Sequence, residues 1–338
     1  MKKLISLICV LAMVLALAAC GSSAPAAATE APAASTEAPD EDVSADKTFV
    51  VGICQLVQHP ALDAATQGFK DALTEALGDK VTFQEQNASG DSATCSLICN
   101  QFVSDEVDLI MANATASIQA AASATNTIPI LGTSITDYGV ALGVDNWTGV
   151  SGTNISGTSD LAPLDGQAAM IQELFPDAKT IGLLYCSGEP NSIFQADSME
   201  ALLTDMGYSV ERYTFADSND VSSVTANACS NSDVLYIPTD NTAASCTEAI
   251  NNVALSAGIP IVAGEEGIAS GCGVATLSIS YYDLGHATGE MAAEILTEGA
   301  DISTMEVRFA PAFTKEYNAD ICEALNITVP EDYVAIAK

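Results

Sequence analysis

The sequence predicts an α/β fold made of two similar, Rossmann-like lobes, each built on a parallel sheet. From Lys47 onward, short β-rich runs alternate with longer helical patterns, which is the order expected of repeated βαβ units. The run Asp108-Leu109-Ile110-Met111-Ala112 is apolar at its last four positions in succession, as in strands that helices cover on both faces. One pattern of elements also occurs twice, which indicates two lobes rather than one long sheet.

The repeated pattern consists of a buried strand, a polar turn that opens a helix, and a second strand at an Ile-Pro-Ile sequence. The first copy spans 107–130 and the second spans 233–261. Ligands of open parallel sheets bind beyond the carboxyl ends of the strands. Two such ends that face each other therefore predict a binding cleft between the lobes.

The predicted elements follow one another in a regular order. Each strand is a short run of β-forming residues, and each helix is a longer run between strands. The predicted strands are 49–55, 81–85, 107–112, 128–132, 180–185, 209–214, 234–237, 259–263 and 273–279. The predicted helices are 61–76, 92–103, 117–124, 163–174, 192–206, 221–229, 243–257 and 283–296.

The N-terminus has the pattern of an export signal. Lys2 and Lys3 precede an apolar run over 4–18, and Leu17-Ala18-Ala19-Cys20-Gly21 resembles a bacterial lipobox. The resemblance implies a signal peptide over 1–19 and a lipid on Cys20. The alternative is an uncut transmembrane anchor, but the apolar run is shorter than the roughly 20 residues needed to span a bilayer. Residues 20–46 are low in complexity and are expected to form a disordered tether.

Charge excludes several classes of partner. The chain has 338 residues, 49% of them hydrophobic, and a formal net charge of −34, from 10 Lys and Arg against 44 Asp and Glu. Such a surface repels nucleic acid. With Arg212 and Arg308 as its arginines, the chain also lacks the guanidinium groups for a multi-arginine phosphate clamp. A small zwitterion or a neutral ligand is still allowed.

The cysteines leave two alternatives open. Apart from Cys9 in the signal and Cys20, the cysteines are Cys54, Cys95, Cys99, Cys186, Cys229, Cys246, Cys272 and Cys322. An even number in an exported protein is compatible with disulfides. The apolar contexts of several favour mostly free, buried thiols instead. With His59 and His286 as the histidines, we expect no metal site and no cofactor.

Motifs of catalysis are absent from the sequence. It contains no P-loop, no G-x-G-x-x-G and no G-x-S-x-G, and only His59 or His286 could serve as the base of a triad. His59 precedes Pro60 at a strand-to-helix turn, where it belongs either to the loop or to the cleft lining. We therefore expect a binding protein with no catalytic residues.

The start of one helix is a candidate site for a carboxylate. Thr115, Ala116 and Ser117 follow the strand at 107–112 and open the next helix. A helix N-terminus holds an anion through its free amides, without arginine. The alternative is ordinary N-capping by Thr115 or Asn113.

Three acidic turns follow strands of the second lobe. They contain Glu189 with Asn191, Asp240 with Asn241, and Glu265. Acids that converge on one cleft favour a cationic group such as an ammonium. The alternative is that these side chains cap helices on a generally acidic surface.

Several segments resemble a group of type I ABC-transporter substrate-binding proteins, whose best-known members bind tryptophan and other aromatic amino acids. The resemblance begins with Gly52-Ile53-Cys54-Gln55 and continues through Gln58-His59-Pro60-Ala61-Leu62-Asp63 and Gly68-Phe69. The other segments are Ala116-Ser117-Ile118-Gln119-Ala120, Thr148-Gly149-Val150-Ser151-Gly152-Thr153, Glu189-Pro190-Asn191-Ser192, Ile237-Pro238-Thr239-Asp240-Asn241 and Ser280-Tyr281-Tyr282-Asp283-Leu284-Gly285.

The resemblance implies a Venus-flytrap protein whose lobes are joined by three hinge crossings, near Asn154, Ile279 and Ile302. Lobe 1 would then comprise 47–154 plus 280–301, and lobe 2 would comprise 155–279 plus 302–338. The implied ligand-binding residues are Gln55, Gln58, Thr115, Ala116, Ser117, Thr133, Glu189, Asn191, Asp240, Asn241, Glu265 and Tyr282. Candidates for an aromatic wall are Tyr138, Trp147, Phe194 and Tyr282.

The resemblance also implies a function and partners. The protein would be a lipid-anchored, extracytoplasmic monomer that delivers an amino acid to an ABC permease driven by a separate ATPase. A sugar or nucleoside carrier of the same fold and a sensing ectodomain without transport remain alternatives. An enzyme is the weakest alternative.

Overall fold

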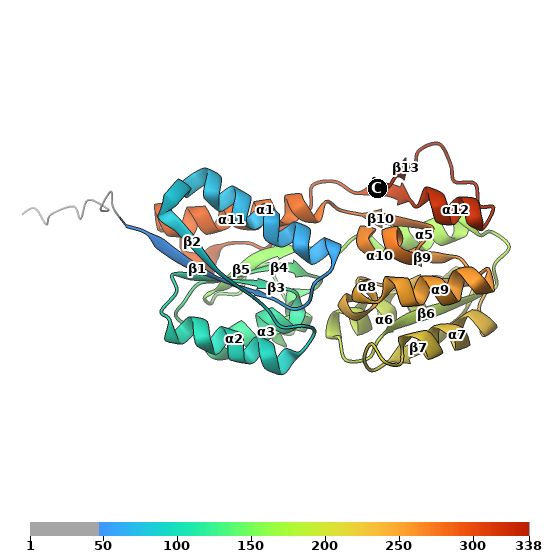
Figure 1. Cartoon of the computed structure of the whole chain (residues 1–338), viewed down its shortest axis with the longest axis horizontal. Helices are drawn as coiled ribbons and strands as arrows, with labels where there is room; N and C mark the ends of the chain where they lie inside the picture. The colour runs from blue at the N-terminus through green and yellow to red at the C-terminus, as the bar shows by residue number, and fades with distance from the viewer. Residues whose placement is uncertain (1–46, 338) are drawn as a thin grey trace, which may run out of the picture. The chain divides into compact units, whose positions relative to one another are not determined.

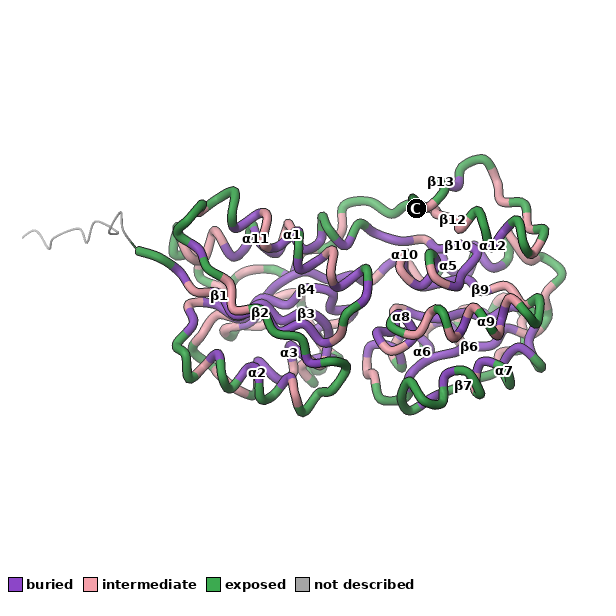
Figure 2. The backbone as a smooth tube through the Cα atoms, viewed as in Figure 1, coloured by how far each residue is buried: buried purple, intermediate pink, exposed green. Residues whose placement is uncertain are grey.

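The computed structural model describes residues 47–337, which belong to one compact unit of the chain. The predicted signal peptide, Cys20 and the tether lie outside these residues. Within them, the α/β class is confirmed: the strands form two sheets, and helices cover both faces of each (Figure 1). Figure 2 shows the central strands of each sheet buried inside the lobes, whereas the edge strands, the outer helix faces and the loops are more exposed.

Lobe 1 is built on a six-stranded sheet in the order β11-β5-β4-β3-β1-β2, with all its pairs parallel. Its strands are β1 (Phe49–Gln55), β2 (Val81–Asn87), β3 (Leu109–Asn113), β4 (Ile130–Ile135), β5 (Ile155–Ser159) and β11 (Arg308–Phe309). Helices α1 (Pro60–Leu77) and α11 (Tyr281–Glu298) cover one face, and α2 (Ser92–Ser104) and α3 (Thr115–Ala124) cover the other. The shorter elements are α4 (Tyr138–Leu142), η1 (Gly78–Lys80) and η2 (Ile302–Thr304).

Lobe 2 is built on a seven-stranded sheet in the order β13-β12-β10-β9-β8-β6-β7, in which only β10 and β12 are antiparallel neighbours. Its strands are β6 (Thr180–Cys186), β7 (Ser209–Phe215), β8 (Val234–Ile237), β9 (Ile261–Ala263), β10 (Ala275–Ser278), β12 (Thr314–Tyr317) and β13 (Val334–Ala335). Its helices are α5 (Leu164–Leu174), α6 (Pro190–Asp205), α7 (Val221–Asn231), α8 (Asn241–Ser245), α9 (Thr247–Ala257), α10 (Glu266–Cys272) and α12 (Ala319–Ala324).

Strand β5 is the main element that the sequence pattern did not predict. Its sequence, Ile-Ser-Gly-Thr-Ser, has one large apolar residue, yet all five positions are buried between β4 and β11. Gly157 is required there, because a Cβ at this position would lie 2.0 Å from the Gly132 carbonyl oxygen. The predicted single helix at 243–257 also differs, since it breaks at Cys246 into α8 and α9.

These pairings move two of the expected hinge crossings. We expected a crossing near Asn154, but Ile155 pairs with Ile130 in lobe 1, so the chain crosses at 160–163, after β5. The crossing expected near Ile302 falls at 310–313, because Arg308 pairs with Thr158 in the sheet of lobe 1. The remaining crossing lies at 279–280, between β10 and α11. Residues 155–159 and 302–309 therefore belong to lobe 1.

No helix within residues 47–337 is long and apolar enough to cross a membrane.

Helices α1 and α11 pack closely because glycines face the neighbouring backbone. A Cβ at Gly285 would lie 1.9 Å from the Ala65 carbonyl oxygen. We therefore expect Gly285→Ala to lower the free energy of unfolding by about 2 kcal/mol or more through overpacking. Helix propensity alone would raise it by roughly 1 kcal/mol, so the sign of the change is diagnostic. Urea unfolding measures the difference.

Gly188→Ala is the matched control, because a Cβ at Gly188 meets nothing closer than 3.7 Å. This control should change the unfolding free energy by less than about 0.5 kcal/mol. Equal stabilities for Gly285→Ala and the wild type would contradict the close approach of α1 and α11.

Candidate functional site

Loops after the carboxyl ends of both sheets line the same space between the lobes. An outer cavity of about 370 Å³ is lined by residues of lobe 1, including Leu56, Asp91 and Ala116, and of lobe 2, including Glu189, Asp217 and Asn241. An inner cavity of about 10 Å³, close to the space of one water molecule, is lined by His59, Leu62, Asp160, Thr239, Asp240, Asn241, Ala244, Glu265 and Tyr281. Asn241 lines both cavities, so the two are neighbours with this residue between them.

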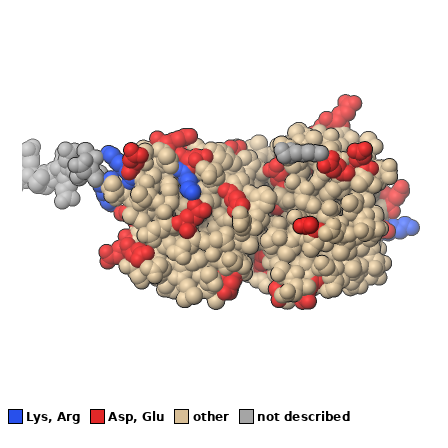
Figure 3. Space-filling model, in the orientation of Figure 1, with Lys and Arg blue, Asp and Glu red and all other residues tan. Residues whose placement is uncertain are grey.

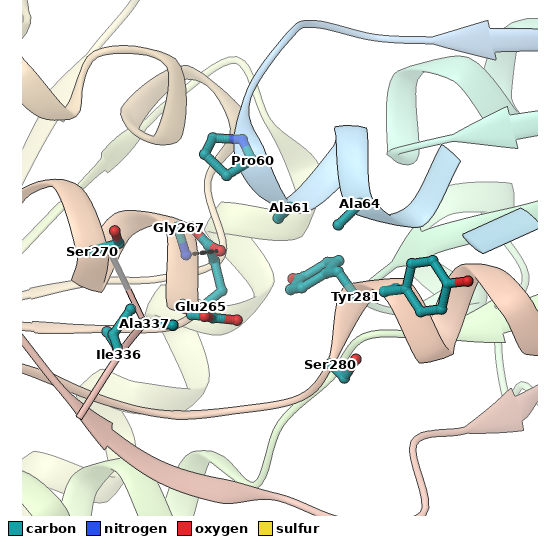
Figure 4. A pocket seen from close by; sticks show the side chains of 12 residues that line it. Pro60, Ala61, Ala64, Glu265, Gly267, Ser270, Ser280, Tyr281, Ile336 and Ala337 are labelled. Carbon is teal, nitrogen blue, oxygen red and sulfur yellow. Dashed lines mark hydrogen bonds between the residues drawn. The ribbon is translucent and has the colours of Figure 1, made fainter. Parts of the chain in front are cut away.

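A third cavity lies on the hinge side. This hinge groove, of about 300 Å³, runs past Pro60, Ala61 and Ala64 of α1 and past Gly267 and Ser270 of α10 (Figure 4). Glu265 and Tyr281 line both the hinge groove and the inner cavity. These two side chains therefore separate the inner cavity from the hinge side.

The lobes and their crossings touch through polar side chains around the inner cavity. His59 Nε2 of lobe 1 lies 3.3 Å from Asn241 Oδ1 of lobe 2. A second contact joins two hinge crossings: the hydroxyl of Tyr281, which follows the crossing at 279–280, donates to Oδ2 of Asp160, in the crossing at 160–163, at 3.0 Å. Farther along, Gln195 Nε2 of α6 donates to Thr136 Oγ1 of lobe 1 at 3.5 Å. The described arrangement is thus one in which the lobes meet.

Two of the predicted acids cap helices of lobe 2. Asp240 Oδ1 accepts from the Ala243 amide at 2.8 Å, and Oδ2 accepts from the Cys186 amide at 2.6 Å. Glu265 accepts from the Ile268 and Gly267 amides at 2.5 and 2.6 Å. Burial raises the pKa of Glu265 to about 7. Burial also raises the pKa of Asp240, with a further contribution from the charge of Glu189.

Glu189 and Asn191 hold the turn before α8 in place. Both Glu189 carboxylate oxygens accept hydrogen bonds from backbone amides, from Asn241 at 3.0 Å and from Thr242 at 2.8 Å. The Asn191 side-chain amide donates to the Thr239 carbonyl at 3.0 Å. Glu189 and Asn241 line the outer cavity, whereas Asn191 does not line it and donates to Glu189 Oε2 at 3.2 Å.

One residue in the first turn of α3 lines the outer cavity. Ala114 is the N-cap, with a φ of 89°, and no side chain caps the helix. Ala116 lines the outer cavity, while Thr115 is buried beside it. Ser117 points the other way: its hydroxyl lies 3.7 Å from Cys54 Sγ and 3.6 Å from Cys95 Sγ in the core.

Three other predicted residues lie away from the cavities. Gln55 is buried and donates to the Val57 carbonyl and to Asp63, which fixes the loop before α1. Thr133 contacts the Thr158 hydroxyl at 3.2 Å inside lobe 1. Gln58 is exposed and lines none of the three cavities.

The structure brings Tyr281, not Tyr282, to the cleft. Tyr282 is 39% exposed and donates to Asp71 at 2.9 Å across the outside of α1 and α11. Tyr281 is 4% exposed and lines the inner cavity. Successive residues of a helix are about 100° apart around its axis, so the side chains of Tyr281 and Tyr282 point in different directions. Tyr282 lines only the hinge groove. The other aromatic candidates line none of the three cavities: Tyr138 is in the core of lobe 1, stacked on Trp147 at 5.7 Å, and Phe194 is half-buried on α6.

Sequence reasoning missed Asp160 and Tyr281 and left His59 between two interpretations. Asp160 follows β5, the strand that lacks an apolar pattern, so no strand end marked it. Burial raises the pKa of Asp160 to about 6, and burial lowers the pKa of His59. His59 Nδ1 and Asp160 Oδ1 are both buried and have no hydrogen-bond partner.

The cysteines of residues 47–337 are free thiols, and all but Cys246 are buried. Within the same range, no cluster of three or more His, Cys, Asp and Glu side chains has an arrangement suited to a metal ion.

The raised pKa of Asp160 makes stability depend on pH in a defined direction. A carboxyl group whose pKa rises from 3.8 to about 6 on folding stabilises the folded protein at low pH, and this contribution is lost as pH rises through 6. We expect the ligand-free wild type to lose about 1 kcal/mol relative to Asp160→Asn between pH 5 and pH 8. Urea unfolding of both proteins at the two pH values measures this. Parallel pH profiles would show that Asp160 is not buried as described.

Comparisons with known proteins identify the family. Residues 50–338 match the family model described as ABC transporter substrate binding protein. A tyrosine-binding protein of Clostridioides difficile is 38% identical over 280 residues, which is 82% of this chain and 81% of the relative.

Two solved structures carry the comparison further. The ABC domain from Streptococcus pneumonia in complex with L-Trp has a TM-score of 0.80 and 32% identity, over 84% of this chain and 97% of that one. The ligand-free, open structure of a substrate-binding protein with adhesive properties from Clostridium difficile has a TM-score of 0.66 and 37% identity, over 86% and 99% of the two chains. The chain belongs to the family of ABC transporter substrate-binding proteins.

Proposed function

We propose that this protein captures an aromatic amino acid between its lobes and delivers it to the permease of an ABC importer. The observation that carries the proposal is the pair of neighbouring cavities, because both lobes supply their linings. A ligand there contacts both lobes and stabilises the closed form, which a permease can distinguish from the open one. The chain fits the L-Trp complex better than the open, ligand-free structure, which supports a closed arrangement.

The charges around the cavities favour a zwitterion. Neither cavity is lined by a Lys or Arg among the described residues, whereas Asp91, Glu189 and Asp217 line the outer one. The carboxylate of the ligand would bind at the start of α3, near the amides of Thr115 and Ala116, where the helix dipole favours an anion. The side chain would occupy the outer cavity, whose volume is within the range of small-molecule sites.

The aromatic class rests on the relatives, which include a tyrosine-binding protein and a protein solved with L-Trp. Tyr281 at the inner cavity is the one aromatic side chain that the described cleft offers. Binding and release suffice for this function, so we assign no bond-making step. We further propose that the protein acts as a monomer, on the outer face of the cell membrane.

A melting scan against the twenty amino acids tests the ligand class. We expect L-tyrosine, L-tryptophan or L-phenylalanine to raise the melting temperature most, because a ligand at a hundred times its Kd adds about 2.7 kcal/mol of stability. If no amino acid shifts the midpoint while ribose or a nucleoside does, the protein is a sugar or nucleoside carrier.

A pair of variants on α3 tests the carboxylate position in the same assay. Ala116→Asp places a negative charge at the helix start, where it favours the helix but repels a bound carboxylate. We expect at least a tenfold loss of affinity. Ser123→Asp, on an exposed position near the other end of α3, is the control and should keep wild-type affinity. Unchanged binding by Ala116→Asp would contradict this position.

The N-terminal sequence supports a lipid anchor on Cys20. We expect Cys20→Ala to move the protein from the membrane fraction to the soluble fraction, because the variant has no thiol to acylate. Cys246→Ser is the control and should stay with the membrane. Retention of Cys20→Ala in the membrane fraction would contradict lipidation at this residue.

A further inference from the structure

Two buried acceptor atoms in the inner cavity have no partner. His59 is 6% exposed and Asp160 is 3% exposed, and both line this cavity. His59 Nδ1 and Asp160 Oδ1 make no hydrogen bond within the described chain. Buried polar atoms are almost always paired, so two orphans in one cavity indicate a missing partner.

The hydrogen bonds of Asn241 determine whether His59 Nδ1 is a donor or an acceptor. The Asn241 side-chain nitrogen donates to Glu189 Oε2 at 2.7 Å, and the reverse orientation would place two acceptors together. Asn241 Oδ1 therefore faces His59 Nε2, at 3.3 Å, and Nε2 must carry the hydrogen. Burial lowers the pKa of His59 and keeps the ring neutral, which leaves Nδ1 as an acceptor.

Asp160 offers the second acceptor. Its Oδ2 takes the hydrogen bond from the Tyr281 hydroxyl. The Thr136 side chain also interacts with the Asp160 carboxylate and lowers its pKa, but Oδ1 has no partner with the distance and angles of a hydrogen bond. The unsatisfied oxygen therefore belongs to an acid whose charge has no cation beside it in the cavity.

A primary ammonium group has the chemistry that this cavity lacks. It supplies three N–H donors and one positive charge, whereas water would satisfy the two acceptors but leave the charge of Asp160 uncompensated. A cavity of about 10 Å³ suits a group of this size and excludes a larger one. The charge of Asp160 also acts on Glu265, so a cation here relieves repulsion between the two acids.

We propose that His59 Nδ1 and Asp160 Oδ1 form the subsite that recognises the primary ammonium of the ligand. This proposal rests on the proposed function, in that the ligand is an amino acid. It replaces the sequence-based assignment of the ammonium to Glu189, Asp240 and Glu265, because backbone amides already occupy these carboxylates. Since Asp160 lies on one hinge crossing and Tyr281 beside another, ammonium binding also stabilises the closed hinge.

The test compares L-tyrosine and L-tryptophan with their α-hydroxy acid analogues, 4-hydroxyphenyllactate and indole-3-lactate, by calorimetric titration. We expect the wild type to prefer each amino acid at least a hundredfold, since a site built around a hydrogen-bonding group rejects ligands that lack it. In Asp160→Asn and in His59→Leu, the preference should fall at least tenfold, through loss of affinity for the amino acid. Melting curves without ligand verify that each variant folds.

Glu266→Gln is the matched control, because Glu266 lines the hinge groove and not the inner cavity. This variant should prefer the amino acid over the hydroxy acid as strongly as the wild type does. If the wild type prefers the amino acid and both cavity variants keep that preference, the ammonium subsite is wrong while the proposed function stands. If the wild type binds neither amino acid, the proposed function fails and the subsite with it.

Discussion

The arrangement of side chains between the lobes is constrained by carboxylates that are buried with no cationic side chain beside them. Asp160, Asp240 and Glu265 lie at the inner cavity, and no Lys or Arg among the described residues lines it. Removing a charge from water is costly unless hydrogen bonds or an opposite charge compensate for it. The chain compensates Asp240 and Glu265 with helix-start amides, and it leaves one oxygen of Asp160 without a hydrogen-bond partner.

This constraint links local structure to function. The caps that satisfy Asp240 and Glu265 also begin α8 and α10, and Glu189 holds the Asn241 side chain whose oxygen orients His59. Glu189, Asn241 and His59 therefore form one hydrogen-bonded chain across the lobes, and the capped starts of α8 and α10 lie beside it at the inner cavity. Acidic side chains also lie over both lobes on the face in Figure 3, so the negative charge of the chain is general, and only a few acids are buried at the site.

The sequence was sufficient to predict the fold but not the orientation of side chains in the cleft. Apolar runs such as residues 109–112 identify buried parallel strands directly. Strand β5 has one large apolar residue, so the sequence pattern predicted neither the hinge crossing after it nor the burial of Asp160. Tyr281 and Tyr282 are equivalent in sequence, and only the packing of α11 on α1 decides which enters the cleft. The acidic turns were correctly placed after strands, but whether a carboxylate caps a helix or faces a ligand depends on backbone geometry.

The most direct test of this account is a high-resolution crystal structure of the protein with L-tyrosine or L-tryptophan bound. The account predicts the ligand nitrogen within hydrogen-bond distance of both His59 Nδ1 and Asp160 Oδ1, with Asp240 and Glu265 still bound to their helix amides. A ligand nitrogen held by other groups, with water between His59 and Asp160, would contradict it.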